Sequence, residues 1–165
     1  MQLAMSAASL SSSSERASRA VVVRTGAYIG AIPLEDVIEI VRPLRVQRVP
    51  GAPAYVRGVA VVRGVPVPVV DLAVLLGEPP SHDARWVLLR PTRGQRLVAL
   101  SVDAMLGLRE LSGKAMGEVP PLLGQARGAS VTSLGALDRD LLLTLDAARA
   151  IPPDVWHALE VAEGQ

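Results

Sequence analysis

Residues 49–72 read VPGAPAYVRGVAVVRGVPVPVVDL, and this stretch decides the fold. Two runs rich in β-branched residues, 59–62 and 65–70, flank Arg63-Gly64, which is the spacing of a hairpin with a two-residue turn. The prolines and glycine of residues 50–53 force a separate turn just before the first run. The stretch therefore predicts a turn followed by a β-hairpin.

The second half of this stretch predicts an edge and a helix start. Pro66 and Pro68 have no N–H to donate to a ladder, so they are expected to face a side of the hairpin that is unpaired. Asp71 is a favourable helix N-cap, and Gly77 is a favourable residue just beyond a helix end. A short capped helix is therefore expected to end at Leu76.

Short Val- and Leu-rich runs separated by Gly and Pro recur on both sides of this stretch, so the whole chain is predicted to be mostly β. Further hairpins are expected between residues 21–23 and 28–32, between 86–89 and 96–102, and between 131–137 and 141–145. Extended segments are expected over 38–41 and 103–111, one helical turn over 33–37, a polar loop over 78–84, and a terminal helix from Pro152 to about Val161.

A weak internal repeat bears on the architecture. Residues 58–73 and 134–147 each begin near a glycine, pass through a predicted hairpin and end in an aspartate followed by apolar residues. The separation between glycine and aspartate is similar in the two copies. We therefore expect two small packed barrels, each closed by a capped helical turn.

Composition limits the possible functions. The chain has 165 residues, half of them hydrophobic, and a net charge of +1 from 17 basic and 16 acidic residues. Aromatic residues make up only 2%, which leaves few platforms for stacked bases. Neither nucleic-acid binding nor direct membrane insertion is expected, since no apolar run approaches the roughly 20 residues of a membrane-spanning helix.

The first 18 residues differ from the rest of the chain. They are rich in Ser and Ala, and their apolar residues show no period, so residues 1–18 are expected to be a disordered tail before one domain over 19–165. This segment lacks the basic leader and long apolar core of a signal peptide. Together with the absence of cysteine, this favours a cytoplasmic protein.

The motifs of common enzymes are absent from the sequence. Phosphate-binding glycine loops, dinucleotide fingerprints and nucleophile elbows are not present, so no catalytic residue and no cofactor is expected. His82 and His157 stand without the spacing of metal ligands, and no metal is expected. Asp71, Asp103 and Asp146 suggest structural use more than paired catalytic carboxylates, because two of them precede predicted helical turns.

The order of these segments resembles the CheW-like domain family. The most specific likeness is residues 49–72, with Pro-Gly-x-Pro, Gly-Val, Arg-Gly and Val-Val-Asp-Leu in order, and residues 32–40, 97–103 and 134–137 support it. The resemblance implies two intertwined five-stranded SH3-like barrels with short helical turns and a C-terminal helix. It also implies a non-enzymatic adaptor that couples the cytoplasmic tip of a chemoreceptor to the regulatory domain of a CheA-type histidine kinase at receptor clusters.

Candidate sites follow from the resemblance by position. The receptor-binding candidates are Val37, Glu39, Arg63, Met105 and Leu108. The kinase- or array-binding candidates are Val61, Val65, Val67 and Leu122. Arg63 and Glu39 are expected to lie close enough to interact, and the three apolar receptor candidates are expected to line one partly exposed groove.

Other interpretations of these residues stay open at this point. Val37, Met105 and Leu108 also fit core positions, and Arg63 and Glu39 also fit ordinary exposed positions. Val61 stands where many relatives have Asn, and Pro121 beside Leu122 stands at an often polar position. The alternative function is therefore a diverged CheW-like protein that binds receptor but has lost kinase coupling.

Overall fold

The computed structural model describes residues 18–90, 96–111, 116–117, 131–137, 140–145 and His157. The predicted tail lies outside the described residues apart from Ser18, where the first strand begins. The helical turn predicted after Asp146 and the terminal helix also lie outside them, apart from His157, which is helical and exposed. Within the described ranges, no helix is long and apolar enough to cross a membrane.

Strands dominate the described chain, which confirms the mostly β prediction. In chain order they are β1 (Ser18–Thr25), β2 (Tyr28–Pro33), β3 (Val37–Val41), β4 (Val56–Val62), β5 (Val65–Asp71), β6 (Arg85–Leu89), β7 (Val98–Val102), β8 (Ala104–Leu111), β9 (Met116–Gly117), β10 (Val131–Leu137) and β11 (Asp140–Leu145). A 3-10 turn, η1 (Leu34–Asp36), precedes β3, and one short helix, α2 (Leu72–Leu75), follows β5.

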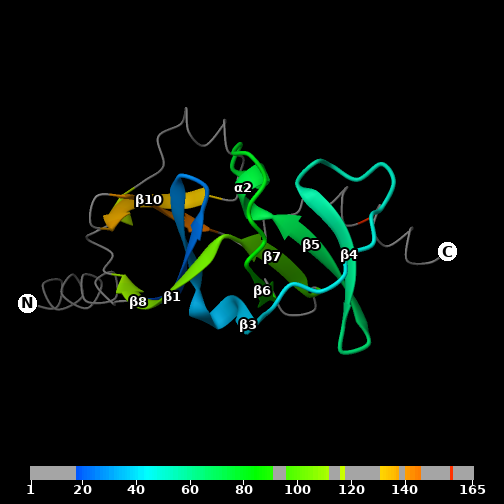
Figure 1. The fold of residues 1–165 in the computed structure, drawn as a ribbon. Coiled ribbons are helices and arrows are strands. Elements are labelled where there is room, and N and C mark those ends of the chain that lie inside the picture. Colours follow the sequence, from blue (N-terminus) through cyan, green and yellow to red (C-terminus); the bar gives the residue numbers. More distant parts are fainter. Residues whose placement is uncertain are drawn as a thin grey trace, which may run out of the picture.

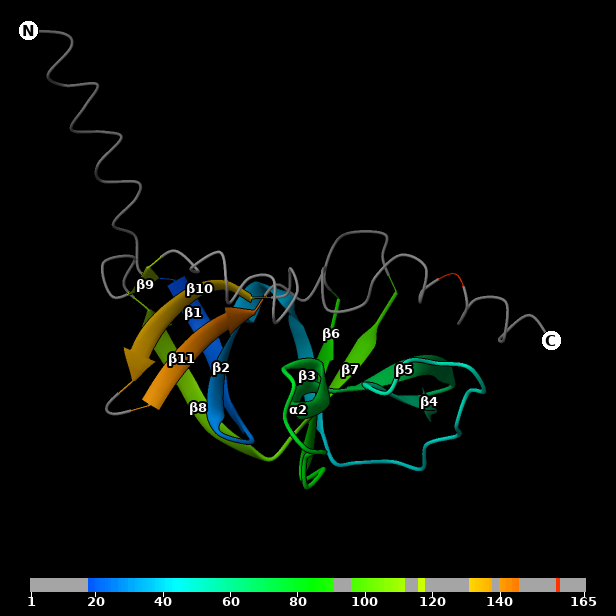
Figure 2. The same cartoon turned by 90° about the horizontal axis from the view of Figure 1, so that it is seen from above.

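The strands form two sheets that lie side by side, with α2 between them (Figures 1 and 2). One sheet has the order β8-β1-β2-β11-β10-β9, so it contains the first two and the last four described strands. The other has the order β3-β6-β7-β5-β4 and contains the strands between them. The first sheet has five long strands, as expected for each half, and the two-residue β9 is added at its edge.

The two sheets exchange strands in the same way, which explains the internal repeat. After the β1–β2 hairpin the chain crosses to the other sheet, where β3 pairs antiparallel with β6. After the antiparallel pair β6–β7 the chain crosses back to the first sheet, where β8 pairs antiparallel with β1. Each sheet is completed by a second hairpin, β4–β5 or β10–β11, whose later strand lies parallel to β7 or β2. The expected intertwining of two halves is therefore observed.

The core has three parts, because each sheet buries apolar side chains on both of its faces. One cluster lies inside the curl of the β3–β7 sheet and includes Trp86, and another lies inside the first sheet and includes Val22. The largest cluster combines residues of both sheets and of α2, including Val21, Val87 and Leu72. Strands buried on both faces need apolar residues at successive positions, which is why β7 is buried throughout.

The β4–β5 hairpin has the turn that its sequence predicts. Arg63 and Gly64 both have positive φ, 50° and 79°, as a two-residue turn of type I′ requires. Pro66 and Pro68 stand at positions whose nitrogens point away from β4, since the ladder alternates from the turn. Pairing of β5 with β7 begins only at Val69, so both prolines face an unpaired side as predicted, although the edge strand itself is β4.

Candidate functional site

Arg63 and Glu39 form an ion pair at the surface of the β3–β7 sheet. Arg63 follows β4 in the hairpin turn, and its Nη2 lies 2.5 Å from Oε1 of Glu39 on β3. The two side chains are 74% and 30% exposed. The expected interaction is confirmed, and it brings together two residues that lie 24 positions apart in the sequence.

This contact joins the two ends of the sheet. Strands β3 and β4 are the outermost strands in the order β3-β6-β7-β5-β4, so the sheet must curl for the turn after β4 to reach β3. The cluster around Trp86 supports this curl, because Val41 of β3 packs against the same cluster that contains Ala60 of β4. The curl places Glu39 and Arg63 on one continuous surface.

Exposed apolar side chains occupy the strands on both sides of the ion pair. Ile38 and Ile40 flank Glu39 on β3 and are 52% and 42% exposed, while Val61 and Val65 flank the hairpin turn and are 63% and 46% exposed. Glu39 lies opposite Leu88 of the cluster around Trp86, whereas Ile40 lies opposite Val87 of the large cluster, so Ile38 and Ile40 point to the other face of β3 from Glu39. The exposed apolar residues at the hairpin end are therefore Val61 and Val65, and exposed apolar residues beside an ion pair are typical of a protein contact surface. We call Glu39, Arg63, Val61 and Val65 the hairpin surface.

The structure separates the three apolar receptor candidates into two classes. Val37 and Met105 are partly buried and pack against the large core cluster between the sheets. Leu108 lies on β8 opposite Val21 and is 57% exposed. A single groove lined by all three stays a prediction.

The kinase candidates also differ in their exposure. Val61 and Val65 belong to the hairpin surface, but Val67 is fully buried in the cluster around Trp86. This burial speaks against a direct contact by Val67: it points to the same face of β5 as Val65 but lies further from the turn, where the cluster around Trp86 covers it. Leu122 lies outside the described residues.

A polar network inside the molecule was missed by the sequence analysis. Arg57 donates from Nη2 to Oδ2 of Asp71 at 2.8 Å and to the carbonyl and hydroxyl oxygens of Ser81, both at 3.1 Å. Its Nη1 lies 3.5 Å from the carboxylate of Asp83, which accepts hydrogen bonds from Ser101 and the indole of Trp86. Arg57 stands one residue before Gly58, and nothing in its local pattern marks it as a network residue.

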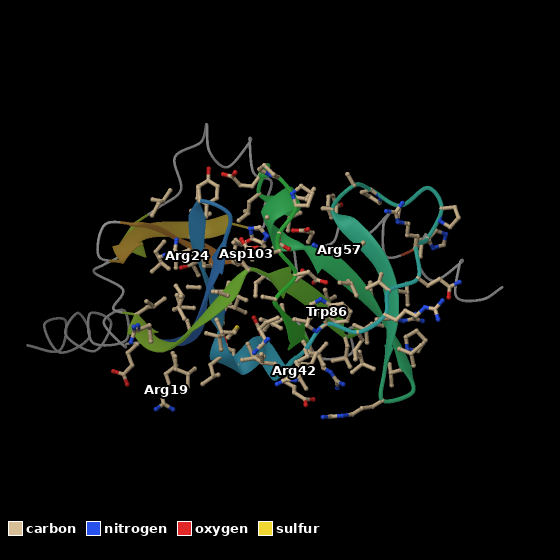
Figure 3. The ribbon with its side chains drawn as sticks, in the orientation of Figure 1. Arg19, Arg24, Arg42, Arg57, Trp86 and Asp103 are labelled. Carbon is tan, nitrogen blue, oxygen red and sulfur yellow. The ribbon has the colours of Figure 1, made fainter. Side chains whose placement is uncertain are left out.

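The two described aspartates that raised the question of paired catalysis serve structural roles. Asp71 accepts hydrogen bonds from the backbone of Ala73 and Val74 and so caps α2 as predicted. Asp103 accepts from the backbone of Gly26 at 2.7 Å and of His82 at 2.5 Å, which ties the β1–β2 turn to the loop before β6. Figure 3 shows Asp103 and Arg57 at the junction of the two sheets.

Comparisons with known proteins agree with this architecture. A family model described as "CheW-like domain" matches residues 19–152. A solved structure of the scaffolding protein TtCheW from Thermoanaerobacter tengcongensis superposes with a TM-score of 0.67 over 79% of this chain and 89% of that one, at 23% identity. This likeness shows that the fold is shared.

Curated relatives are similar over part of their length. A chemotaxis protein CheW of Klebsiella aerogenes is 29% identical over 108 residues, 65% of each chain. A probable chemotaxis protein CheW of Rhizobium etli is 26% identical over 59% of this chain and 63% of its own length. A chemotaxis protein CheW of Helicobacter pylori is 38% identical over 36% of this chain and 38% of its own. The chain thus spans less than two thirds of each of these relatives.

Proposed function

Because the chain belongs to the CheW-like domain family, we propose that it is a non-enzymatic scaffold that couples chemoreceptors to a CheA-type histidine kinase in a chemotaxis-type pathway. The proposed place of action is the cytoplasm, at receptor clusters. The names of the relatives, which are chemotaxis proteins, and of the structural neighbour, which is a scaffolding protein, support this assignment.

The observation that carries the proposal is the ion pair of the hairpin surface. Arg63 and Glu39 are held together at 2.5 Å, although an ion pair this exposed stabilises a fold by only about 0.2–1 kcal/mol. Its value therefore lies more in fixing the positions of two charged groups than in holding the sheet together. A fixed ion pair at an exposed position gives a partner an anchor for hydrogen bonds.

We assign receptor binding to Glu39 and Arg63 together with Val37, Met105 and Leu108. A receptor tip is a helical coiled coil, and a helix binds through an apolar stripe laid against an apolar surface. Leu108 supplies exposed apolar area, while Val37 and Met105 supply partly exposed side chains at the border of the core.

We assign kinase contact to the tip of the β4–β5 hairpin through Val61 and Val65. Both side chains are exposed, and beyond Val59, which pairs with Gln47, the outer side of the edge strand β4 has no strand partner among the described residues. The unpaired side of Pro66 and Pro68 limits open-ended strand addition there, because neither nitrogen can donate. Leu122 stays a candidate on the family resemblance alone.

A reconstitution experiment tests the coupling. The full chain, a receptor signalling tip and the kinase regulatory domain from the same organism are mixed and analysed by size-exclusion chromatography with light scattering. We expect a ternary complex. Arg63→Ala should weaken receptor binding, whereas Arg19→Ala, an exposed arginine on β1, should leave it unchanged.

The outcome also distinguishes the coupling scaffold from the second candidate function. Receptor binding without binding to any kinase regulatory domain of the organism would favour the diverged protein that has lost kinase coupling. The replacement of a hydrogen-bonding residue type by Val61, at an exposed position, is the observation behind this alternative. Absence of receptor binding would contradict both candidates.

A further inference from the structure

The charges of the chain are balanced overall, but they are unevenly distributed. Between Glu39 and Asp71 the sequence has five arginines and no acidic residue. Three of them, Arg42, Arg45 and Arg48, lie at every third position in the segment between β3 and β4, and all three are exposed. Among the described residues, none of the three forms an ion pair with a carboxylate. We call residues 42–49 the basic segment.

The basic segment is fixed against the outer side of β4 (cyan in Figure 2). Gln47 and Val59 exchange two backbone hydrogen bonds, each of 2.8 Å. Gly58 makes this approach possible, because a Cβ at that position would lie 2.1 Å from the carbonyl oxygen of Gln47. Val46 packs against the cluster around Trp86 and turns inward, while its neighbours Arg45 and Gln47 are exposed.

A pocket of about 600 Å³ opens beside this segment. Its apolar wall includes Leu44, Val46 and Val49, and the turn residue Ala54 also lines it. Arg48 lines it without a carboxylate partner among the described residues, whereas the second arginine there, Arg57, is engaged by Asp71 and Asp83. The acidic lining residue, Asp83, is paired with Arg57. The pocket therefore combines an apolar wall with one guanidinium, that of Arg48, which has no carboxylate partner among the described residues, and Arg42 and Arg45 lie along the same segment.

We propose that the basic segment and its pocket bind an acidic peptide segment of a partner protein, with one apolar side chain in the pocket and carboxylates on the arginines. Guanidinium groups bind carboxylates through paired hydrogen bonds. Arg42 and Arg48 are six residues apart, which is at most about 22 Å of extended chain, so an extended peptide of similar length can reach all three arginines. This site shares none of the candidate receptor or kinase residues.

The side chains around the arginines favour an acidic peptide over other anionic partners. The pocket lining contains no aromatic side chain on which a base could stack, which disfavours single-stranded nucleic acid. A membrane surface would need a broad apolar face around the arginines, whereas the large exposed apolar residue of the basic segment is Leu44 alone, at 45% exposure.

Fluorescence anisotropy with the full chain tests the site. The probe is a fluorescein-labelled ten-residue peptide with one central leucine flanked on each side by glutamates, and a glutamine-for-glutamate peptide is its control. We expect saturable binding that weakens with added salt, since exposed charge pairs are screened. Arg45→Gln with Arg48→Gln should weaken binding about three- to tenfold, as expected for the loss of two exposed charge contacts.

Two further variants sharpen the test. Arg19→Gln with Arg109→Gln removes the same charge from exposed positions on β1 and β8 and should leave the affinity unchanged. Ala54→Trp places a large side chain at the exposed rim of the pocket and should weaken binding at least as much as the arginine pair does. Circular dichroism of each variant confirms folding.

Three results would overturn the proposal. One is the absence of saturable binding of the glutamate peptide at low salt. Another is an equal loss of affinity in the Arg19 and Arg109 control, which would indicate attraction by net charge alone. The third is tighter binding of an oligouridine RNA or of phosphatidylglycerol vesicles at the same arginines. Because receptor and kinase binding should survive in the Arg45 and Arg48 variant, failure here is separable from failure of the proposed scaffold function.

Discussion

The two ends of strand β4 make the same kind of ion pair in opposite surroundings. At the first end, Arg57 pairs with Asp71, whose side chain is only 3% exposed. At the hairpin end, Arg63 pairs with Glu39 while its own side chain is 74% exposed. Burial and shared hydrogen bonds, more than the pairing itself, therefore decide whether an ion pair stabilises the fold or belongs to a surface.

The buried end is connected to much more of the structure. Besides binding Arg57, the Asp71 carboxylate accepts backbone hydrogen bonds from Ala73, Val74 and Ser81. Removing it leaves several donors unsatisfied in a place with little water, which is costly. At the hairpin end, water replaces whatever a lost Glu39 or Arg63 had bound.

Asp71→Ala is expected to produce the largest effect. Loss of the carboxylate should lower the free energy of unfolding by about 3–5 kcal/mol, as for breaking a buried pair and its cap. Urea denaturation of the full chain measures this. Glu39→Ala is the matched control and should cost at most about 1 kcal/mol. Equal losses in the two variants would remove the distinction between the two ends.

Gly58→Ala should destabilise the chain by about 2–4 kcal/mol, because the new Cβ collides with the backbone of Gln47 and φ there is +143°. Gly64 in the hairpin turn is the control, since it also has positive φ but no neighbouring atom within 4 Å. Gly64→Ala should therefore cost only about 1 kcal/mol. Thermal unfolding followed by circular dichroism compares the two, and the reverse order would contradict the close approach of the basic segment.

Val62→Ala and Val61→Ala test the face alternation at the hairpin end. Val62 is 7% exposed inside the curled sheet, and its truncation should cost about 1–3 kcal/mol through lost burial and a cavity. Val61 is 63% exposed, and its truncation should change stability by less than about 0.5 kcal/mol. A large destabilisation by Val61→Ala would show that this residue is core and not part of a contact surface.

Arg63→Ala should have only a small effect on stability, at about 0.2–1 kcal/mol. Its effect should appear instead in receptor binding, measured by isothermal titration with a receptor signalling tip. A double variant with Glu39→Ala checks the pairing, because two residues that act together should lose less together than the sum of their separate losses. Full additivity would mean that the ion pair has no role in the contact.

The sequence alone determined the local elements of this protein. The turn at Arg63-Gly64, the cap of Asp71 on α2 and the single turn before β3 were predicted and are observed. Each depends on backbone preferences and on hydrogen bonds between residues a few positions apart, so neighbouring residue types are sufficient to specify it. The repeat of hairpin and aspartate also pointed correctly to two related halves.

The receptor candidates could be named from the sequence only through the family resemblance. The pairing of Arg63 with Glu39 crosses from one edge of a sheet to the other, and no local pattern encodes such a contact. Balanced total charge likewise concealed the basic segment, because an average over the whole chain cannot show that five arginines share one stretch without an acid.

Tertiary structure decided how much of each strand is covered. Val65 and Val67 point to the same face of β5, yet the curled sheet buries Val67 and leaves Val65, next to the turn, at the surface. Three other features have the same origin. They are the hydrogen bonds of Arg57, the exchange of β3 and β8 between the sheets, and the pairing of Gln47 with Val59 that Gly58 allows. All depend on register and curvature between segments far apart in the chain, which are set by the packing of both sheets together and not by any one stretch of residues.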